Sequence, residues 1–199
     1  MKKYFMLSLV FGAVIFTACN SNNSNDQNDV TTDSSVTQTE GDNSAPSASG
    51  NETNAGASIN GVVSNYLKIK NALANDNSKE AASAATEVLN AMNTLGQASL
   101  TSEQKKVYDE VQEDAKEHAD HIIYTAGKID HQREHFETLS KDVYDLVKTF
   151  GAGQTLYQDF CPMYNNNKGA TWISETKEIK NPYLGKKMPT CGEVKEEIK

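Results

Sequence analysis

Beyond the first nineteen residues the chain has two cysteines and three methionines, and all of them except Met92 lie at the two ends of one short stretch. Cysteine and methionine occur together as Cys161-Pro162-Met163, and again as Met188-Pro189-Thr190-Cys191. Thiolates and thioethers are soft ligands, and such ligands suit a soft monovalent ion such as Cu(I). The stretch therefore predicts a site for Cu(I) or Ag(I), with Cys161, Met163, Met188 and Cys191 as its metal ligands.

The same two cysteines allow a second interpretation, a disulfide between Cys161 and Cys191. Thiols that are close enough to share a metal ion are also close enough to oxidise. A disulfide closing a loop of this length contributes about 3–4 kcal/mol, enough to clamp a small appendage onto a larger body. The two methionines favour the metal, because a disulfide does not need a thioether beside it.

The four histidines are further candidate metal ligands. His118 and His121 are spaced i, i+3, whereas His131 and His135 are spaced i, i+4. Either spacing places a pair on one side of a helix, as a metal site requires. No spacing fixes a third ligand, so hydrogen-bonded or solvated histidines remain the simpler interpretation. Phosphate loops and nucleophile turns are absent from the sequence, and the chain is therefore not expected to be an enzyme.

The beginning of the chain is typical of an exported protein. Two lysines precede an apolar run, and small residues then lead to Cys19; this stretch is too short to be a membrane-spanning helix. Residues 16–19 resemble a bacterial lipoprotein cleavage box, so residues 1–19 are predicted to be a signal peptide and Cys19 the lipidated residue. The predicted location is the cell envelope, lipid-anchored to a membrane on the periplasmic face or the outer surface. A plain secretory signal is the alternative.

Residues 20–58 are rich in Asn, Ser, Thr, Asp and Gly, and contain no Lys or Arg. Such a composition buries too little apolar surface to offset the entropy of ordering, so it predicts a disordered tether. A flexible coil of this length spans on the order of 30–40 Å. The net charge of −8, without a basic patch, excludes nucleic acid as a partner.

The folded domain is predicted to comprise residues 59–199 and to be mainly α-helical. Apolar residues recur at helical spacing in four stretches, residues 59–73, 81–95, 107–129 and 136–150. Thr101-Ser102-Glu103-Gln104 is typical of a capping box. Four amphipathic helices with short links predict an antiparallel four-helix bundle. Residues 155–192, which we call the Cys/Met segment, predict a small β-hairpin and loop appendage, with Trp172 and Tyr164 as packing residues.

The chain also resembles an uncharacterised bacterial family, a domain of unknown function. The similarity extends upstream of the motif through the predicted helices, including Gln132-Arg133 and Phe136, and covers roughly residues 60 to 195. Its motif falls on Cys161-Pro162-Met163, Gly169-Ala170-x-Trp172, Ile179-x-Asn181-Pro182-Tyr183-x-Gly185 and Met188-x-x-Cys191-Gly192. Proteins of that family occur alone as exported proteins, or attached to copper/silver efflux adaptors of the membrane-fusion class. The resemblance implies a role as a metal buffer, or as a donor to a heavy-metal efflux adaptor or pump.

Overall fold

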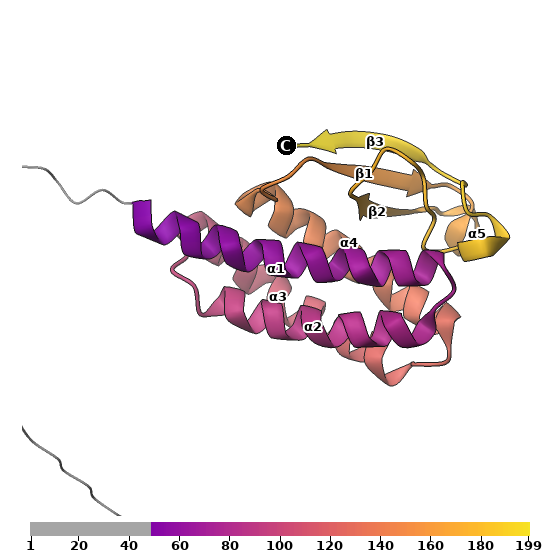
Figure 1. Cartoon of the computed structure of the whole chain (residues 1–199), viewed down its shortest axis with the longest axis horizontal. Coiled ribbons are helices and arrows are strands. Elements are labelled where there is room, and N and C mark those ends of the chain that lie inside the picture. The colour runs from indigo at the N-terminus through magenta and orange to yellow at the C-terminus, as the bar shows by residue number, and fades with distance from the viewer. Residues whose placement is uncertain (1–48) are drawn as a thin grey trace, which may run out of the picture. The chain divides into compact units, whose positions relative to one another are not determined.

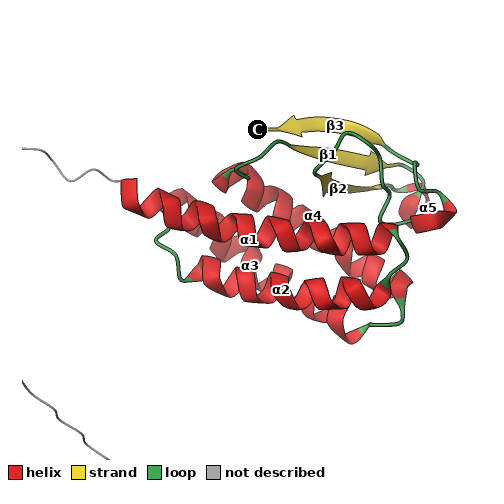
Figure 2. Ribbon diagram, viewed as in Figure 1, coloured by secondary structure: helices red, strands yellow, loops and turns green. Residues whose placement is uncertain are grey.

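The computed structural model describes residues 49–199, except for the side chains of residues 49–54 and 57. The described residues form four long helices, α1 (Ser49–Ala74), α2 (Ser78–Gly96), α3 (Ser102–Tyr124) and α4 (Ile129–Phe150). They continue into strand β1 (Leu156–Cys161), the short helix α5 (Tyr164–Asn167), strand β2 (Ala170–Ser174), the 3-10 turn η1 (Gly185–Lys187) and strand β3 (Glu193–Ile198). The protein is therefore mainly helical, with a small antiparallel sheet after the helices (Figure 2). The predicted signal peptide, Cys19 and most of the predicted tether lie outside the described residues.

Local capping fixes the starts of two helices. The Asn77 side chain accepts a hydrogen bond from the backbone N–H of Glu80 at the start of α2. At the start of α3, the Thr101 hydroxyl accepts from the Gln104 backbone, and the Gln104 side chain accepts from the Thr101 backbone. These bonds satisfy backbone donors that the first turn of a helix leaves free. The predicted capping box is confirmed.

The four long helices pack around one apolar core. Helix α1 contacts α2, α2 contacts α3, α3 contacts α4, and α4 contacts α1 as well. The core also includes the inner face of the sheet, because β2 contacts both α4 and α1 (Figure 1). Within the described residues, no helix is long and apolar enough to cross a membrane.

Helix α1 begins at Ser49, inside the stretch that the sequence assigns to the tether. Ala55 and Ile59 are both 1 % exposed and share the inner face of this helix. The prediction placed the start at Ile59 because residues 49–58 are small and polar and carry almost no apolar periodicity. Small residues such as Ala55 can still pack in the core, because they extend the helix whose apolar face begins at Ile59.

The boundary between the third and fourth helices also differs from the prediction. Helix α3 ends at Tyr124, so Ala126 and Ile129 do not belong to its apolar stripe. Gly127 has a φ of +89°, a left-handed conformation that glycine adopts without steric penalty, and the chain turns there. Ile129 then becomes the first residue of α4.

The sheet has the strand order β2-β1-β3. The predicted hairpin of β1 and β2 is confirmed, with Cys161 opposite Ala170 and Tyr157 opposite Ser174. Strand β3 was not predicted, because its sequence Glu-Val-Lys-Glu-Glu-Ile has little apolar content. It pairs with the free edge of β1, and the register shifts between Gln158 and Asp159.

Candidate functional site

The two cysteines of the Cys/Met segment lie side by side. Cys161 ends β1, and Cys191 lies just before β3, whose first residue Glu193 pairs with Phe160. Antiparallel pairing of β1 and β3 therefore brings both cysteines to the same end of the ladder. Their Sγ atoms are 2.8 Å apart, longer than a disulfide bond of about 2.05 Å, and both thiols are free.

The environments of the two thiols differ. Cys161 is fully buried in the core, whereas Cys191 is half-buried. Burial, and then the adjacent Cys161 thiol, raise the pKa of Cys191 to about 11, and the backbone N–H of Met163 opposes this shift. Cys191 therefore carries its proton at neutral pH, and a metal ion would have to displace that proton in order to bind.

Both methionines of the segment present their side chains to solvent. Met163 is 50 % exposed and Met188 is 38 % exposed, whereas Met92 is fully buried in the helical core. The backbone of each is held next to Cys191. The Met163 N–H lies against the Cys191 sulfur, and the Met188 carbonyl accepts a hydrogen bond of 3.2 Å from the Cys191 N–H. Methionine usually fills gaps in cores, so two exposed thioethers beside a dithiol are not explained by packing.

Asn181 ties the Asn-Pro-Tyr turn to Cys191. Its side-chain oxygen accepts hydrogen bonds of 2.8 Å from the N–H groups of Tyr183 and Leu184. Its side-chain amide donates to the Cys191 carbonyl at 2.6 Å, and its backbone N–H donates to the Pro189 carbonyl at 2.9 Å. Asn181 is completely buried, so these bonds are protected from water. The turn therefore fixes the backbone on one side of the dithiol.

Arg133 of α4 anchors this turn to the helices. Its Nε donates to the Pro182 carbonyl at 2.8 Å, and its Nη2 donates to the Leu73 carbonyl at 3.0 Å. Nη2 also pairs with the Asp76 carboxylate at 2.6 Å. Burial alone would raise the pKa of Asp76, but hydrogen bonds from Arg133 and from the Lys186 N–H lower it overall. One buried guanidinium thus joins the end of α1, α4 and the Cys/Met segment.

The sequence offered only a weak signal for the anchoring role of Arg133. Arg133 lies three residues before Phe136 on the apolar face of α4, where a surface arginine is not expected. It entered the sequence interpretation only as part of the family resemblance. A charged residue on a predicted core face is the pattern that could have identified it, because such residues are rarely buried without a partner.

An aromatic cluster packs behind the dithiol. Tyr183 stacks on Tyr164 at 4.5 Å between ring centroids, and the Trp172 ring meets Tyr183 edge-on at 5.8 Å. Trp172 is 1 % exposed, in agreement with its predicted packing role. Gly192 has a φ of +143°, and a Cβ there would lie 2.9 Å from the Trp172 ring. The residue after Cys191 must therefore be glycine for the backbone to approach the tryptophan.

Under the sheet lies a buried group of charges that the sequence analysis missed. Lys70 is fully buried and pairs with Glu175 at 2.7 Å. Asp159 is also fully buried, and neither of its carboxylate oxygens has a hydrogen-bond partner among the described residues. Burial, with the nearby Glu175 charge, raises the pKa of Asp159 to about 7, although Lys70 acts in the opposite direction. The Trp172 indole N–H also lowers the pKa of Asp159, but it is not aligned well enough to count as a hydrogen bond.

The histidines form a separate group between α3 and α4. The Nδ1 atoms of His118 and His135 are 2.9 Å apart, and the His121 ring stacks on that of His135 at 4.4 Å. His131 is exposed and pairs with Glu134 at 2.8 Å. Every described side-chain interaction of these histidines involves residues of α3 and α4, and none reaches the Cys/Met segment. Within residues 49–199, no three His, Cys, Asp or Glu side chains are arranged to hold a metal ion.

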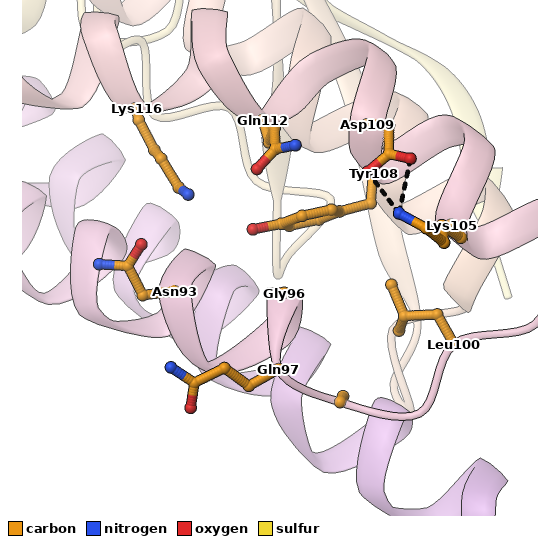
Figure 3. A pocket seen from close by; sticks show the side chains of 10 residues that line it. Asn93, Gly96, Gln97, Leu100, Lys105, Tyr108, Asp109, Gln112 and Lys116 are labelled. Carbon is orange, nitrogen blue, oxygen red and sulfur yellow. Dashed lines mark hydrogen bonds and ion pairs between the residues drawn. The ribbon is translucent and has the colours of Figure 1, made fainter.

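Several surface hollows border the helices, and two of them show how far the dithiol is from open surface pockets. The first, of about 670 Å³, lies between α2 and α3, and Tyr108, one of its lining residues, donates to the Met92 carbonyl. Figure 3 shows this hollow, with Lys105 paired with Asp109 at its edge. The second, of about 540 Å³, lies between α4 and the Cys/Met segment and is lined by Tyr164 and Tyr183. The first is lined only by residues of α2, α3 and their connection, so it is separate from the dithiol, whereas the second borders the same aromatic cluster.

Comparison with known proteins finds that the helical part is similar to an uncharacterised family. Residues 62–155 match the family described as "Protein of unknown function (DUF3347)". The matched region covers the second half of α1 and all of α2, α3 and α4, and it ends at the residue before β1. No curated protein and no solved structure has significant similarity to the chain. The match is consistent with a domain of unknown function, and it does not include the cysteines or exposed methionines.

Proposed function

We propose that this protein is an exported, lipid-anchored module that binds Cu(I) or Ag(I) and acts as a buffer or donor for a heavy-metal efflux system. The metal ligands are Cys161, Met163, Met188 and Cys191. The observation that carries the proposal is the pairing of two free thiols, 2.8 Å apart, with two exposed methionines whose backbones contact Cys191. Soft sulfur ligands suit a soft monovalent ion.

The exposure of the thioethers supports a role in metal transfer rather than in permanent storage. Cys161 is fully buried and holds the ion from the core side. Met163 and Met188 approach from the solvent side, where ligands of a partner can replace them one at a time. An ion bound in this way leaves by ligand exchange, without unfolding of the domain.

The remaining parts of the proposal concern anchoring and partners. Lipidation of Cys19 and the tether after it would hold the domain near a membrane in the cell envelope, and the four helices would serve as an antiparallel bundle that supports the segment. The family resemblance supports an efflux adaptor or pump as the partner. The proposal includes no catalytic step and no nucleic acid.

A structural role with a Cys161–Cys191 disulfide is the second candidate. The short distance between the two Sγ atoms favours it, because oxidation would need little movement of the backbone. The other contacts of the segment reduce the need for such a clamp. Arg133 and Asn181 already fix the turn to the helices and to Cys191, so the segment is held in place with both thiols free.

Competition against a chromogenic Cu(I) chelator tests the proposal on the reduced protein. Met163→Leu and Met188→Leu keep the size and apolarity of the side chain, so they should weaken Cu(I) binding without lowering stability. Met92→Leu is the matched control, because Met92 is a buried core residue outside the site. Zn(II) should bind more weakly than Cu(I), since thioethers are poor ligands for it.

Equal Cu(I) affinity in the wild type and all three methionine variants would show that Met163 and Met188 are not metal ligands. The disulfide role predicts a different result. Cys161→Ser and Cys191→Ser should lower the melting temperature of the oxidised protein, and the methionine variants should leave the metal affinity unchanged. Thiol counting on the exported protein, with and without Cu(I), separates the two redox states directly.

A further inference from the structure

The hollow of about 670 Å³ between α2 and α3 is built around a fixed tyrosine. Tyr108 lines it and is only 5 % exposed, and its hydroxyl donates a hydrogen bond of 2.9 Å to the Met92 carbonyl. A Cβ at Gly96 would overlap that hydroxyl, so a glycine is needed for the tyrosine to approach α2 this closely. The hollow is therefore a rigid feature of two packed helices.

Several polar side chains that line this hollow have no partner elsewhere in residues 49–199. Asn93 belongs to α2 and Gln97 directly follows that helix, whereas Gln112 and Lys116 belong to α3 (Figure 3). None of these side chains makes a hydrogen bond or an ion pair with a described residue. The carboxylate at the edge is different, because both Asp109 oxygens accept from Lys105, at 2.7 and 3.0 Å. The hollow thus offers unused amide groups and one unneutralised positive charge.

That positive charge is held in place by the tyrosine ring. The Lys116 Nζ lies 5.9 Å from the centroid of the Tyr108 ring, and Figure 3 shows the lysine reaching from α3 toward α2. An aromatic face attracts an ammonium group at this distance without neutralising it. An anion that enters the hollow therefore gains a charge-assisted hydrogen bond, and no existing ion pair has to break.

We propose that this hollow is a binding site for an acidic saccharide, a hydroxyl-rich ligand that carries a carboxylate. An amide donates and accepts hydrogen bonds, and so does every sugar hydroxyl, so neighbouring amides match neighbouring hydroxyls. Lys116 then pairs with the carboxylate. An apolar ligand would remove the amides from water without replacing their hydrogen bonds. A cation would find no uncommitted carboxylate among the residues that line the hollow.

This inference goes beyond the proposed metal binding and does not depend on it. No residue of the Cys/Met segment lines the hollow. The connection between α2 and α3 lies at the end of the helices where α1 begins, whereas α5, which follows Met163, lies toward the other end (Figure 1). One domain would therefore carry a metal at one end and an acidic glycan at the other.

Calorimetric titration of the reduced mature chain tests the site with two probes, oligogalacturonate and its methyl ester, which keeps the sugar rings but lacks the charge. Lys116→Gln should weaken binding of the acid about tenfold and leave binding of the ester unchanged. Gln112→Met keeps the length of the side chain and should weaken binding of both probes about fivefold. Lys106→Gln is the matched control, because Lys106 is also on α3, pairs with Glu110 and does not line the hollow. It should bind both probes as the wild type does.

Magnetic resonance of the unsubstituted chain gives a readout that does not depend on how the variants fold. Oligogalacturonate should shift the side-chain amide signals of Asn93, Gln97 and Gln112, and leave those of Asn165 and Asn166, which line the second hollow, in place. Unshifted signals of the first three amides, or equal binding of the acid by the wild type and Lys116→Gln, would overturn the proposal. Displacement of the oligosaccharide by an equal concentration of inorganic phosphate would also overturn it, because the hollow would then recognise only charge.

Discussion

Replacing Asp159 by asparagine should make the folded protein more stable as the pH rises, relative to the wild type. Asp159 is fully buried without a hydrogen-bond partner among the described residues, and its pKa rises from 3.8 to about 7, chiefly through burial. A difference of one pH unit in pKa corresponds to 1.36 kcal/mol. Ionising this carboxyl in the folded state therefore costs about 4 kcal/mol more than in the unfolded chain.

The sign follows from proton binding. Because the folded-state pKa lies above the unfolded value, the folded protein binds more protons between about pH 4 and pH 7. Stability from this group is full below pH 4 and falls as the pH rises through that window, with about 2.5 kcal/mol of the loss between pH 5 and pH 8. Asparagine does not titrate, so the variant should lack this part of the loss.

Urea unfolding at pH 5, 6, 7 and 8 measures the effect. The useful quantity is the difference in free energy of unfolding between Asp159→Asn and the wild type, because an unpaired amide adds a penalty that does not change with pH. Burial also raises the pKa of Asp142 to about 7, and its contribution cancels in this difference. Asp120→Asn, at an exposed position on α3, is the control and should follow the wild type.

Two outcomes would refute the reasoning about Asp159. Parallel pH dependences of the variant and the wild type would mean that the pKa of Asp159 is not raised. An increasing disadvantage of the variant at high pH would mean that Asp159 is ionised and stabilised by the buried Lys70, so that the attraction of Lys70 outweighs the cost of burial.

Two further predictions concern the Cys/Met segment. Arg133→Lys keeps the positive charge but loses the planar guanidinium, which donates hydrogen bonds to the Pro182 and Leu73 carbonyls at the same time. The free energy of unfolding should therefore fall by about 2–3 kcal/mol, and the backbone amides of residues 181–191 should exchange their hydrogens faster. Hydrogen exchange checks this, and unchanged protection of those amides would contradict the anchoring role. Because the pKa of Cys191 is raised to about 11, Cu(I) must displace its proton, and the Cu(I) affinity should rise by about tenfold per pH unit between pH 6 and pH 8 for each proton released. A Cu(I) affinity that does not change with pH would exclude Cys191 as a ligand.

Periodicity predicted most of the helical structure because the core is built from regular apolar stripes. Buried apolar residues recur at helical spacing in α2, at Val88, Met92 and Leu95. The same holds in α4, at Phe136, Val143 and Val147. Periodicity failed to locate two helix boundaries, the start of the first helix and the break between the third and the fourth. Residues 49–58 are too small to form a stripe, and the stripe of the third helix runs without interruption across the turn at Gly127.

For the site, the sequence predicted the proximity of the thiols but not what produces it. The mirrored positions of cysteine and methionine indicated a closed segment, whereas the ladder that closes it depends on β3, which is mostly charged. The burial of Lys70, Asp159 and Arg133 could not be predicted either. Each is a polar residue that is buried by an element far away in the sequence, and no local sequence pattern indicates such a long-range contact.

The pairing of β1 with β3 has a consequence for the order in which the protein folds. The helices make contacts mostly between neighbours in sequence, and such contacts form early, whereas the closing strand is the last described element along the chain. A metal ion that needs both thiols can bind only after that strand has docked, so it stabilises the native state without guiding the helices into place. If the protein is exported to an oxidising compartment, as we propose, chains in which docking is delayed would expose two separated thiols there, and each could exchange with a disulfide of another molecule. Slow docking of β3 should therefore appear as cross-linked oligomers rather than as misfolded helices.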